Sequence, residues 1–191
     1  MNISIRLEHK NDFKKVEHLI REAFWDVYKP RCDEHFIVHR LRKVKAFIKE
    51  LNFVACDQEV IVGHIIYSKA KVIHDDDEFD ILCMGPLAVL PSYQGNGIGT
   101  LLMNDSIEAA KALGYRGIVI FGNPNYYRRF GFENAKTYNI QTAWGTNLEE
   151  FMVLELYEGS LTGVHGKFYA DPVFSVDQEE LANFEKQYSN L

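Results

Sequence analysis

This sequence gives no indication of disulfide bonds, of an export signal or of a membrane-spanning segment. It has three cysteines, Cys32, Cys56 and Cys83, and none belongs to a Cys-x-x-Cys pair. We therefore expect no disulfide framework and a reducing location, the cytoplasm. Residues 1–12 carry charges where a secretory signal needs an apolar centre. The chain also lacks a run of about 18 apolar residues that could cross a bilayer, so a membrane is not a predicted partner.

An excess of positive charge is missing as well. The 27 acidic residues outnumber the 21 lysines and arginines, and the formal net charge is -6 at pH 7. A nucleic-acid-binding protein needs a basic surface, so nucleic acid is not a predicted partner. The acidic balance suits a cationic partner such as an amine. With 191 residues, 47% of them hydrophobic, the chain is long enough to bury a core as one domain.

The N-terminal part of the chain is predicted to form one strand and two helices. Ile3 and Ile5 alternate with polar residues, as in a short strand. Apolar residues then recur at helical spacing after a cap at Asn11 or Asp12. A second helix is predicted over residues 34–50, where Asp33 provides the cap.

The middle of the chain is predicted to form a mixed sheet. Strand-like runs at residues 52–57, 60–72 and 79–90 are joined by short links, which favours an antiparallel meander. A helix over residues 97–113 separates the last of them from a strand at 117–121. That order implies one parallel crossover. The predicted core is therefore α/β, with helices on the faces of a mixed sheet.

The chain is expected to divide into a main domain and a tail. Residues 151–157 form the last clear strand of the core. Glycines punctuate the sequence beyond it, and a final helix is predicted over residues 177–188. We therefore expect a domain at residues 1–157 and a C-terminal extension at 158–191 that packs on it.

The most informative segment runs from Gln94 to Thr100, where three alternate glycines open a predicted helix after a strand. Glycine has no Cβ, so an anion can approach its backbone closely. The first amides of a helix have no partner within the helix, and the helix dipole favours negative charge there. The segment is therefore predicted to bind a phosphate group.

Two common phosphate loops fit this segment poorly. A Walker A loop needs a lysine before its serine or threonine, but Gly99 precedes Thr100. The dinucleotide fingerprint needs a third glycine where Thr100 stands. Gly85-Pro86 also interrupts the preceding strand, because proline removes a donor from the ladder. A nucleotide-dependent enzyme is therefore disfavoured.

The segment Gln94-Gly95-Asn96-Gly97-Ile98-Gly99 resembles the Gln/Arg-x-x-Gly-x-Gly/Ala signature of the GNAT superfamily of acetyl-CoA-dependent N-acyltransferases. The preceding strand, Gly85–Val89, resembles the one that these proteins place before the loop. The resemblance implies a mostly antiparallel mixed sheet with one parallel crossover and helices on both faces. It also implies a splay between the two central strands, where the pantetheine of coenzyme A lies, and the Gly85-Pro86 interruption suits such a splay.

A second element follows the strand at residues 117–121. Asn123 can cap a helix that begins at Pro124. The segment resembles the family's Asn…Tyr-x-(Lys/Arg)-x-Gly-Phe element, whose positions are matched by Tyr127, Arg129, Gly131 and Phe132. The bacterial predicted acetyltransferases that read Pro-x-Tyr-Tyr-x-Arg-Phe-Gly-Phe here are the most similar group. With the flanking strands, the resemblance covers residues 3–156.

The resemblance implies a set of site residues for this chain. Acetyl-CoA would be the acyl donor, and no metal is implied. The residues expected to contact coenzyme A are Leu87, Val89, Gln94, Gly95, Asn96, Gly97, Ile98, Gly99, Thr100, Asn123 and Tyr127.

Two of these residues are predicted to be catalytic. An amine that attacks a thioester forms an oxyanion and expels a thiolate. A tyrosine is protonated at pH 7 and can donate a proton to the leaving sulfur, and Tyr127 is the predicted acid. Its neighbour Tyr126 is expected to point into the core. The backbone amide of Val89 is the predicted donor to the oxyanion.

The general base and the acceptor stay open at this level. Glu22, Asp26 and Glu34 lie where this family usually builds its acceptor pocket, and each is a candidate base. The favoured function is acetyl transfer to a small primary amine by direct attack in a ternary complex. A protein lysine or N-terminal amine is an alternative acceptor, and a non-catalytic acyl-CoA-binding module is an alternative function. The resemblance is also compatible with a homodimer.

A zinc site is weighed and disfavoured. His35 and His39 lie one helical turn apart with Cys32 nearby, a spacing that can bind zinc. Because no fourth ligand is evident, no metal is predicted.

Overall fold

A nine-stranded sheet organises the part of the chain that the computed structural model describes, residues 1–28 and 30–188. Neighbouring strands follow the order β1-β2-β3-β4-β5-β8-β6. Their bounds are β1 (Ile3–Leu7), β2 (Phe47–Asp57), β3 (Val60–His74), β4 (Asp77–Val89), β5 (Gly117–Phe121), β6 (Glu133–Asn134) and β8 (Phe151–Glu155). Along this path only β4 and β5 run parallel. The predicted meander and the parallel crossover are both confirmed.

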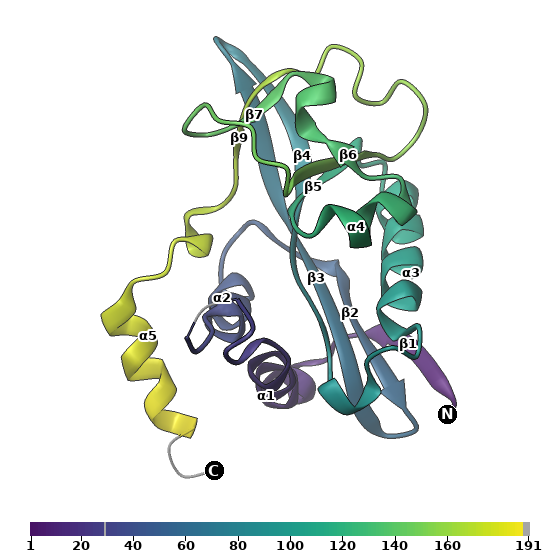
Figure 1. The fold of residues 1–191 in the computed structure, drawn as a ribbon, viewed down its shortest axis with the longest axis vertical. Helices are drawn as coiled ribbons and strands as arrows, with labels where there is room; N and C mark the ends of the chain where they lie inside the picture. The colour runs from purple at the N-terminus through teal and green to yellow at the C-terminus, as the bar shows by residue number, and fades with distance from the viewer. Residues whose placement is uncertain (29, 189–191) are drawn as a thin grey trace.

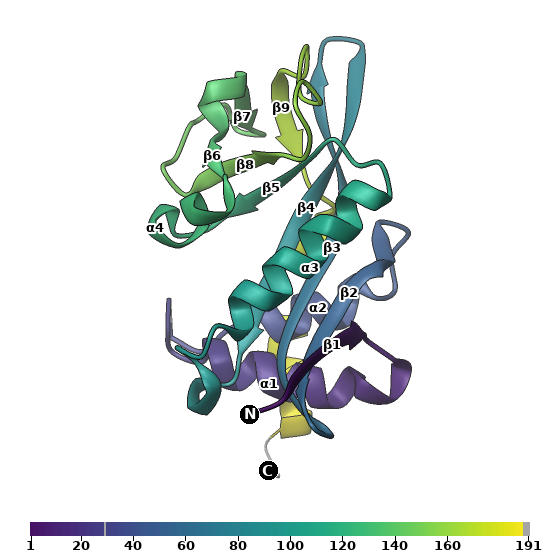
Figure 2. The same ribbon diagram turned by 90° about the vertical axis from the view of Figure 1, so that its right-hand side faces the viewer.

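Helices cover both faces of the sheet (Figures 1 and 2). The α-helices are α1 (Phe13–Phe24), α2 (Glu34–Leu41), α3 (Ile98–Ala112), α4 (Pro124–Tyr127) and α5 (Gln178–Glu185). One hydrophobic cluster lies under α3 and another under α1 and α2, so the central strands are buried on both sides. α1 buries Val16, Leu19 and Ile20, the spacing of one helical face. No helix in the described part of the chain has the length and apolar character needed to cross a bilayer.

The parallel strands β4 and β5 separate soon after they meet. Their last pair is Cys83 with Val119, although β4 runs on to Val89. The register of β4 against β3 shifts at Gly85-Pro86. Proline cannot donate to a ladder, so such a position accommodates a bulge that redirects the strand. The predicted splay between the central strands is confirmed.

The second predicted helix is wrong in its length. α2 ends at Leu41, and β2 begins at Phe47, inside the range 34–50 that was predicted to be helical. Phe47 pairs with Ser68 of β3, so the extended conformation gains a sheet partner there. Tertiary pairing outweighs the helical spacing of the apolar residues.

The C-terminal extension contributes a strand to the main sheet. β9 (Gly166–Tyr169) pairs antiparallel with residues 71–73 of β3, beyond Ser68, where the pairing of β3 with β2 ends. β9 also runs parallel to β7 (Ile140–Thr142), a second parallel pair that the sequence did not predict. A short 3₁₀ helix, η5 (Pro172–Phe174), then leads to α5, which begins at its cap, Asp177.

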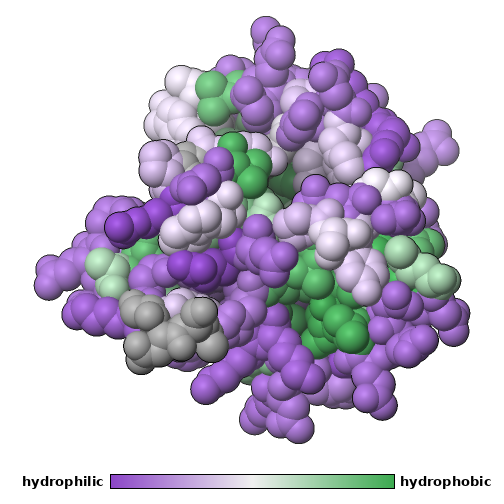
Figure 3. Space-filling model, turned by 60° about the horizontal axis from the view of Figure 1, so that its bottom comes forward, coloured by the Kyte–Doolittle hydropathy of each residue, from purple (hydrophilic) through white to green (hydrophobic). Residues whose placement is uncertain are grey.

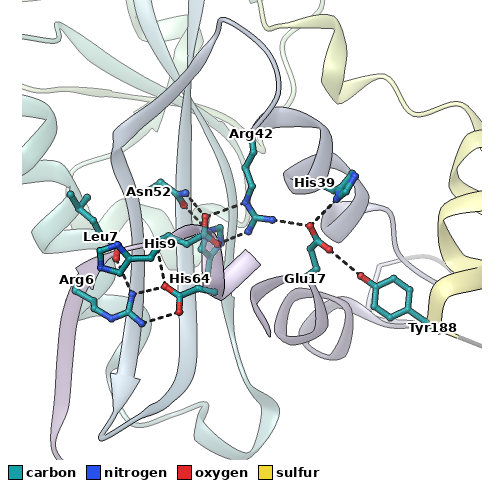
Figure 4. Close-up of polar contacts among 11 residues, drawn as sticks. Arg6, Leu7, His9, Glu17, His39, Arg42, Asn52, His64 and Tyr188 are labelled. Atoms are coloured by element: carbon teal, nitrogen blue, oxygen red, sulfur yellow. Dashed lines mark hydrogen bonds and ion pairs between the residues drawn. The ribbon is translucent and has the colours of Figure 1, made fainter. Parts of the chain in front are cut away.

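A buried ionic network joins α1, α2 and the first strands (Figure 4). Arg42, just after α2, lies between Glu8 and Glu17, and the three side chains are 3%, 0% and 6% exposed. The Nη1 of Arg42 is 2.9 Å from Oε1 of Glu17, and its Nε donates to Oε2 of Glu8 at 3.1 Å. The Tyr188 hydroxyl donates to the other oxygen of Glu17, which ties the C-terminal region to this network. The residue that follows α2 is therefore held by two carboxylates from other parts of the chain.

One histidine of this network, His64, predicts how stability depends on pH. His64 is fully buried, and its Nε2 is 2.8 Å from Oδ1 of Asn52. Burial, helped by the charge of Arg42, lowers the pKa of His64 well below its ordinary value, so the folded protein holds the ring neutral. In the unfolded chain the same ring binds a proton as the pH falls through about 6.5. The unfolded state then binds more protons, and the free energy of unfolding decreases toward acid.

We expect the free energy of unfolding to fall between pH 7 and pH 5, with His64 contributing up to about 1.4 kcal/mol per pH unit. His64→Gln keeps an N–H donor near Asn52 but removes the titration, so its slope against pH should be flatter. Urea unfolding curves at each pH measure both slopes. Equal slopes in the two proteins would contradict this assignment.

Candidate functional site

A cavity of about 1300 Å³ passes through the opening between β4 and β5. It is lined by residues from the turn before α3, from α4, from both separated strands and from the α1–α2 side of the sheet. Figure 3 shows the lower face of the molecule, where hydrophobic side chains gather around a hollow in an otherwise hydrophilic surface. Residues from both faces of the sheet therefore line one cavity at the splay.

The glycine-rich turn lies at one end of this cavity and is open. Gly95 and Gly97 have φ angles of 78° and 79°, in the left-handed region that glycine adopts without strain. A Cβ built on either residue would meet nothing within 4 Å. Gly97 is the N-cap of α3, so the first amides of the helix face this end. The turn thus has the open backbone that an anion requires.

Side chains within the turn hold its shape. The Gln94 amide nitrogen donates to the Val89 carbonyl at 3.0 Å, which joins the loop to the end of β4. The Asn96 amide nitrogen donates to the carbonyls of Tyr93 and Gln94. Asn96 is therefore directed into its own turn, and among the residues predicted to contact coenzyme A it alone does not line the cavity.

The last residues of β4 direct backbone amides into the opening. The Leu90 amide donates to the Val62 carbonyl of β3 at 2.9 Å. Because successive amides of a strand alternate in direction, those of Leu87 and Val89 point away from β3, toward the gap left by β5. The Val89 carbonyl points to the same side, because it accepts a hydrogen bond from the Gln94 side chain. Both predicted strand residues therefore present backbone groups to the cavity.

The second predicted element forms the opposite wall. Asn123 caps α4 by accepting a hydrogen bond from the Asn125 amide at 2.9 Å, and Pro124 occupies the first turn, as predicted. Tyr127 lines the cavity, and its ring packs beside Gly122, where a side chain would overlap it. Burial raises the pKa of Tyr127 above its ordinary value, so the hydroxyl stays protonated. The group can therefore serve as a proton donor.

Tyr126 does not point into the core, and the prediction that it would is wrong. Its ring is half-buried and lines the cavity, and a Cβ on Gly99 would come within 2.5 Å of its hydroxyl. The Arg129 guanidinium lies 3.9 Å from the centre of this ring. α4 is a single turn, so only one of the adjacent tyrosines can face inward, and Tyr127 fits over Gly122. A side chain on Gly99 would collide with Tyr126, which explains this glycine.

Of the three candidate bases, only Glu34 lies in the cavity wall. Glu22 and Asp26 are exposed, and Asp26 accepts a hydrogen bond from the Arg31 amide at 2.6 Å. Glu34 is half-buried in the first turn of α2. The sequence also missed Glu150, a lining residue that precedes β8. The residues around Glu150 gave no sign of a site, because only the pairing of β8 with β5 brings this segment to the cavity.

The histidines weighed as zinc ligands have other partners. The Nε2 of His35 is 2.5 Å from Oε1 of Glu185, and the Nδ1 of His39 is 2.9 Å from Oε1 of Glu17. The Cys32 sulfur is 3.5 Å from the second ring nitrogen of His35. Burial raises the pKa of this thiol to about 12, so it is not a reactive thiolate. Across residues 1–28 and 30–188, no cluster of three or more histidine, cysteine or acidic residues could hold a metal ion.

Comparisons with known proteins agree with the two motifs. Residues 17–132 match the model of the acetyltransferase (GNAT) family. The chain is 31% identical over 163 residues to YhbS of Escherichia coli K12, an uncharacterised N-acetyltransferase, and the match covers 85% of this chain and 92% of that protein. A shorter match, 35% identical over 83 residues, joins 44% of this chain to 46% of another uncharacterised N-acetyltransferase of that bacterium, YjhQ.

Two crystal structures share the fold. YhbS from Escherichia coli in complex with CoA superposes with a TM-score of 0.82 at 28% identity, over 92% of this chain and 93% of that one. A GNAT family acetyltransferase from Brucella melitensis in complex with acetyl-CoA gives a TM-score of 0.73 at 29% identity, over 91% and 98% of the two chains. The chain therefore belongs to the GNAT family of acetyltransferases.

Proposed function

We propose that this chain transfers an acetyl group from acetyl-CoA to a primary amine on a small molecule, by direct attack while both substrates are bound. The observation that carries the proposal is the single cavity that runs from the open turn before α3, through the splay, to the α1–α2 face. Donor and acceptor can then enter from opposite faces and meet between β4 and β5. The two relatives with CoA or acetyl-CoA bound support the choice of donor.

The glycine-rich turn is the proposed site of the coenzyme A diphosphate. The backbone from Gly95 to Gly99 offers amides at the start of a helix, whereas the Thr100 amide already donates to the Gly97 carbonyl at 3.0 Å. The open space at Gly95 and Gly97 leaves room for phosphate oxygens. Leu87 and Val89 on one side and Asn123 on the other would then contact the pantetheine arm. Gln94 and Asn96 would instead support the turn from within, through their hydrogen bonds to backbone carbonyls.

The reaction needs little more than positioning. Acetyl-CoA supplies a thioester, which is already an activated acyl donor, so no covalent enzyme intermediate is required. The Val89 amide would donate a hydrogen bond to the oxygen that becomes negative when the amine attacks. The Tyr127 hydroxyl would donate its proton to the departing sulfur. Glu34 is the proposed general base, which would take the proton from the amine directly or through water.

Gly97→Glu tests whether the glycine-rich turn holds the diphosphate of acetyl-CoA. At 100 times its dissociation constant, acetyl-CoA stabilises a folded protein by about 2.7 kcal/mol. For a chain of this length that corresponds to a rise in melting temperature of about 5–10 °C. Gly97→Glu puts a carboxylate where the diphosphate is proposed to bind and should abolish the rise.

Gly145→Glu is the matched control. Gly145 also has a positive φ of 82° with open space around it, but it does not line the cavity. Both variants therefore carry the same charge and the same backbone strain, and only Gly97→Glu should lose the shift. If Gly97→Glu is stabilised by acetyl-CoA as strongly as the control, the turn does not hold the diphosphate. If acetyl-CoA stabilises none of the proteins, the proposed function is wrong.

A further inference from the structure

The end of the cavity away from the glycine-rich turn is closed by two parts of the chain that are distant in sequence. Phe24 and Ile37 come from α1 and α2, whereas Phe168, Ala170 and Phe174 come from the C-terminal extension. Phe174 packs against both the cluster under α1 and α2 and the cluster around β8 and β9. The extension therefore forms one wall of the proposed acceptor end.

This wall is apolar and largely aromatic. Phe24 and Phe174 are half-buried, so part of each ring stays available to a ligand. Tyr28, which is 78% exposed, lines the cavity near its mouth, with its ring centre 6.1 Å from that of Phe24. Aromatic side chains contribute large apolar contact areas, and they bind other rings in offset or edge-to-face arrangements. Such a wall binds an apolar body better than a chain of charged or hydroxylated groups.

Within the described part of the chain, two carboxylates, Glu34 and Glu150, and one cation line the cavity. Glu34 lies three residues before Ile37 on the same face of α2, so a carboxylate borders the apolar wall. Among the described lining residues the one lysine or arginine is Arg129, which stacks on Tyr126 beside the glycine-rich turn. An ammonium group at the acceptor end therefore meets a carboxylate, and the cation lies at the donor end.

From this arrangement we infer that the acceptor is an arylalkylamine, a primary amine on a short chain that carries an aromatic body. The ring lies against Phe24, Ile37 and Phe174, and Glu34 contacts the amine before it loses its proton. This inference rests on the proposed acetyl transfer and adds the substrate class. A polyamine or a lysine side chain fits less well. A second charge or a polar backbone would be desolvated against the aromatic wall without a partner.

Acetylation of an amine panel tests the inference. Release of thiol from acetyl-CoA is followed with 2-phenylethylamine, tryptamine, spermidine, ethylamine and a lysine-containing peptide. We expect kcat/KM to be at least about tenfold higher for the two arylalkylamines than for the others, the size of effect that an apolar pocket contributes. Preference for spermidine or the peptide would overturn the inference and leave acetyl transfer intact.

Three variants separate a binding wall from general packing. Phe174→Ala should lower kcat/KM for 2-phenylethylamine about tenfold or more and leave ethylamine nearly unchanged. Phe79→Ala is the control, because Phe79 is also half-buried against the cluster around β8 and β9 but does not line the cavity. It should change neither amine selectively. Glu34→Gln should raise KM for the amine more than KM for acetyl-CoA. Equal losses for both amines in Phe174→Ala would argue against the wall.

A binding measurement keeps the inference testable if no amine is acetylated. Calorimetric titration of 2-phenylethylamine into the protein saturated with CoA should show binding that Phe174→Ala weakens and Phe79→Ala does not. Binding without turnover would reject the proposed catalysis and keep the arylalkylamine site. No binding of this amine, with acetylation of another, would reject the site and keep the catalysis.

Discussion

Replacing Tyr127 with phenylalanine is expected to lower kcat by about 10²–10⁴-fold, the usual contribution of a positioned proton donor. The ring would still pack over Gly122 and against Phe132, whose ring centre is 5.7 Å away, so the fold should survive. Only the hydroxyl is lost, and with it the proposed proton for the departing sulfur. Stabilisation by acetyl-CoA should be unchanged, and steady-state kinetics with thermal shift measures both quantities.

Tyr126→Phe is the comparison that decides between the two tyrosines. Its hydroxyl lies beside Gly99 at the glycine-rich turn, so we expect a change in KM for acetyl-CoA with little change in kcat. A large fall in kcat for Tyr126→Phe, with none for Tyr127→Phe, would transfer the role of acid to Tyr126. If neither variant loses activity, the leaving thiolate departs without a tyrosine.

The pH profile gives a second check on Tyr127. An acid must be protonated to act, and an ordinary tyrosine ionises near pH 10. Because burial raises the pKa of Tyr127, loss of its proton should begin only at a higher pH. We therefore expect kcat to show no decline toward alkaline pH below about 10. A descending limb centred near pH 8 or 9 would be inconsistent with Tyr127 as the acid.

Arg42→Met is expected to destabilise the fold by about 3–5 kcal/mol, because it leaves Glu8 and Glu17 buried without their cation. For a chain of this length the melting temperature should fall by about 6–20 °C. Burial already raises the pKa of Glu8, and Arg42 works against that shift. Thermal and urea unfolding of the variant would measure the loss.

Arg40→Met, two residues earlier in α2, provides the control. Arg40 lies 3.6 Å from Glu180, whose side chain is 62% exposed, so this pair should be worth no more than about 1 kcal/mol. Restoring charge balance gives the converse test. Adding Glu8→Gln and Glu17→Gln to Arg42→Met should recover part of the lost stability, because no unpaired charge then remains buried. If Arg42→Met and Arg40→Met are equally mild, the network is not a significant source of stability.

The local features of this protein were determined by its sequence. The glycines at 95, 97 and 99 required a close backbone approach, and the cap and proline at Asn123-Pro124 fixed where α4 begins. Gly85-Pro86 marked the bulge at which β4 leaves β5. Each of these signals depends on the backbone conformation of a few neighbouring residues. They were sufficient to predict the turn proposed to bind phosphate, whereas the fold family was predicted from the resemblance of the two motifs to the GNAT signature.

Other features were decided only by the tertiary structure. The early end of α2 reflects the pairing of Phe47 with Ser68 in the sheet, and the inward position of Tyr127 depends on the space over Gly122. The aromatic wall exists because β9 pairs with β3 and brings Phe174 against α1 and α2. These contacts join residues that are far apart along the chain. Local periodicity does not reveal such long-range pairing, so the proposed acceptor end of the cavity could be recognised only in the folded molecule.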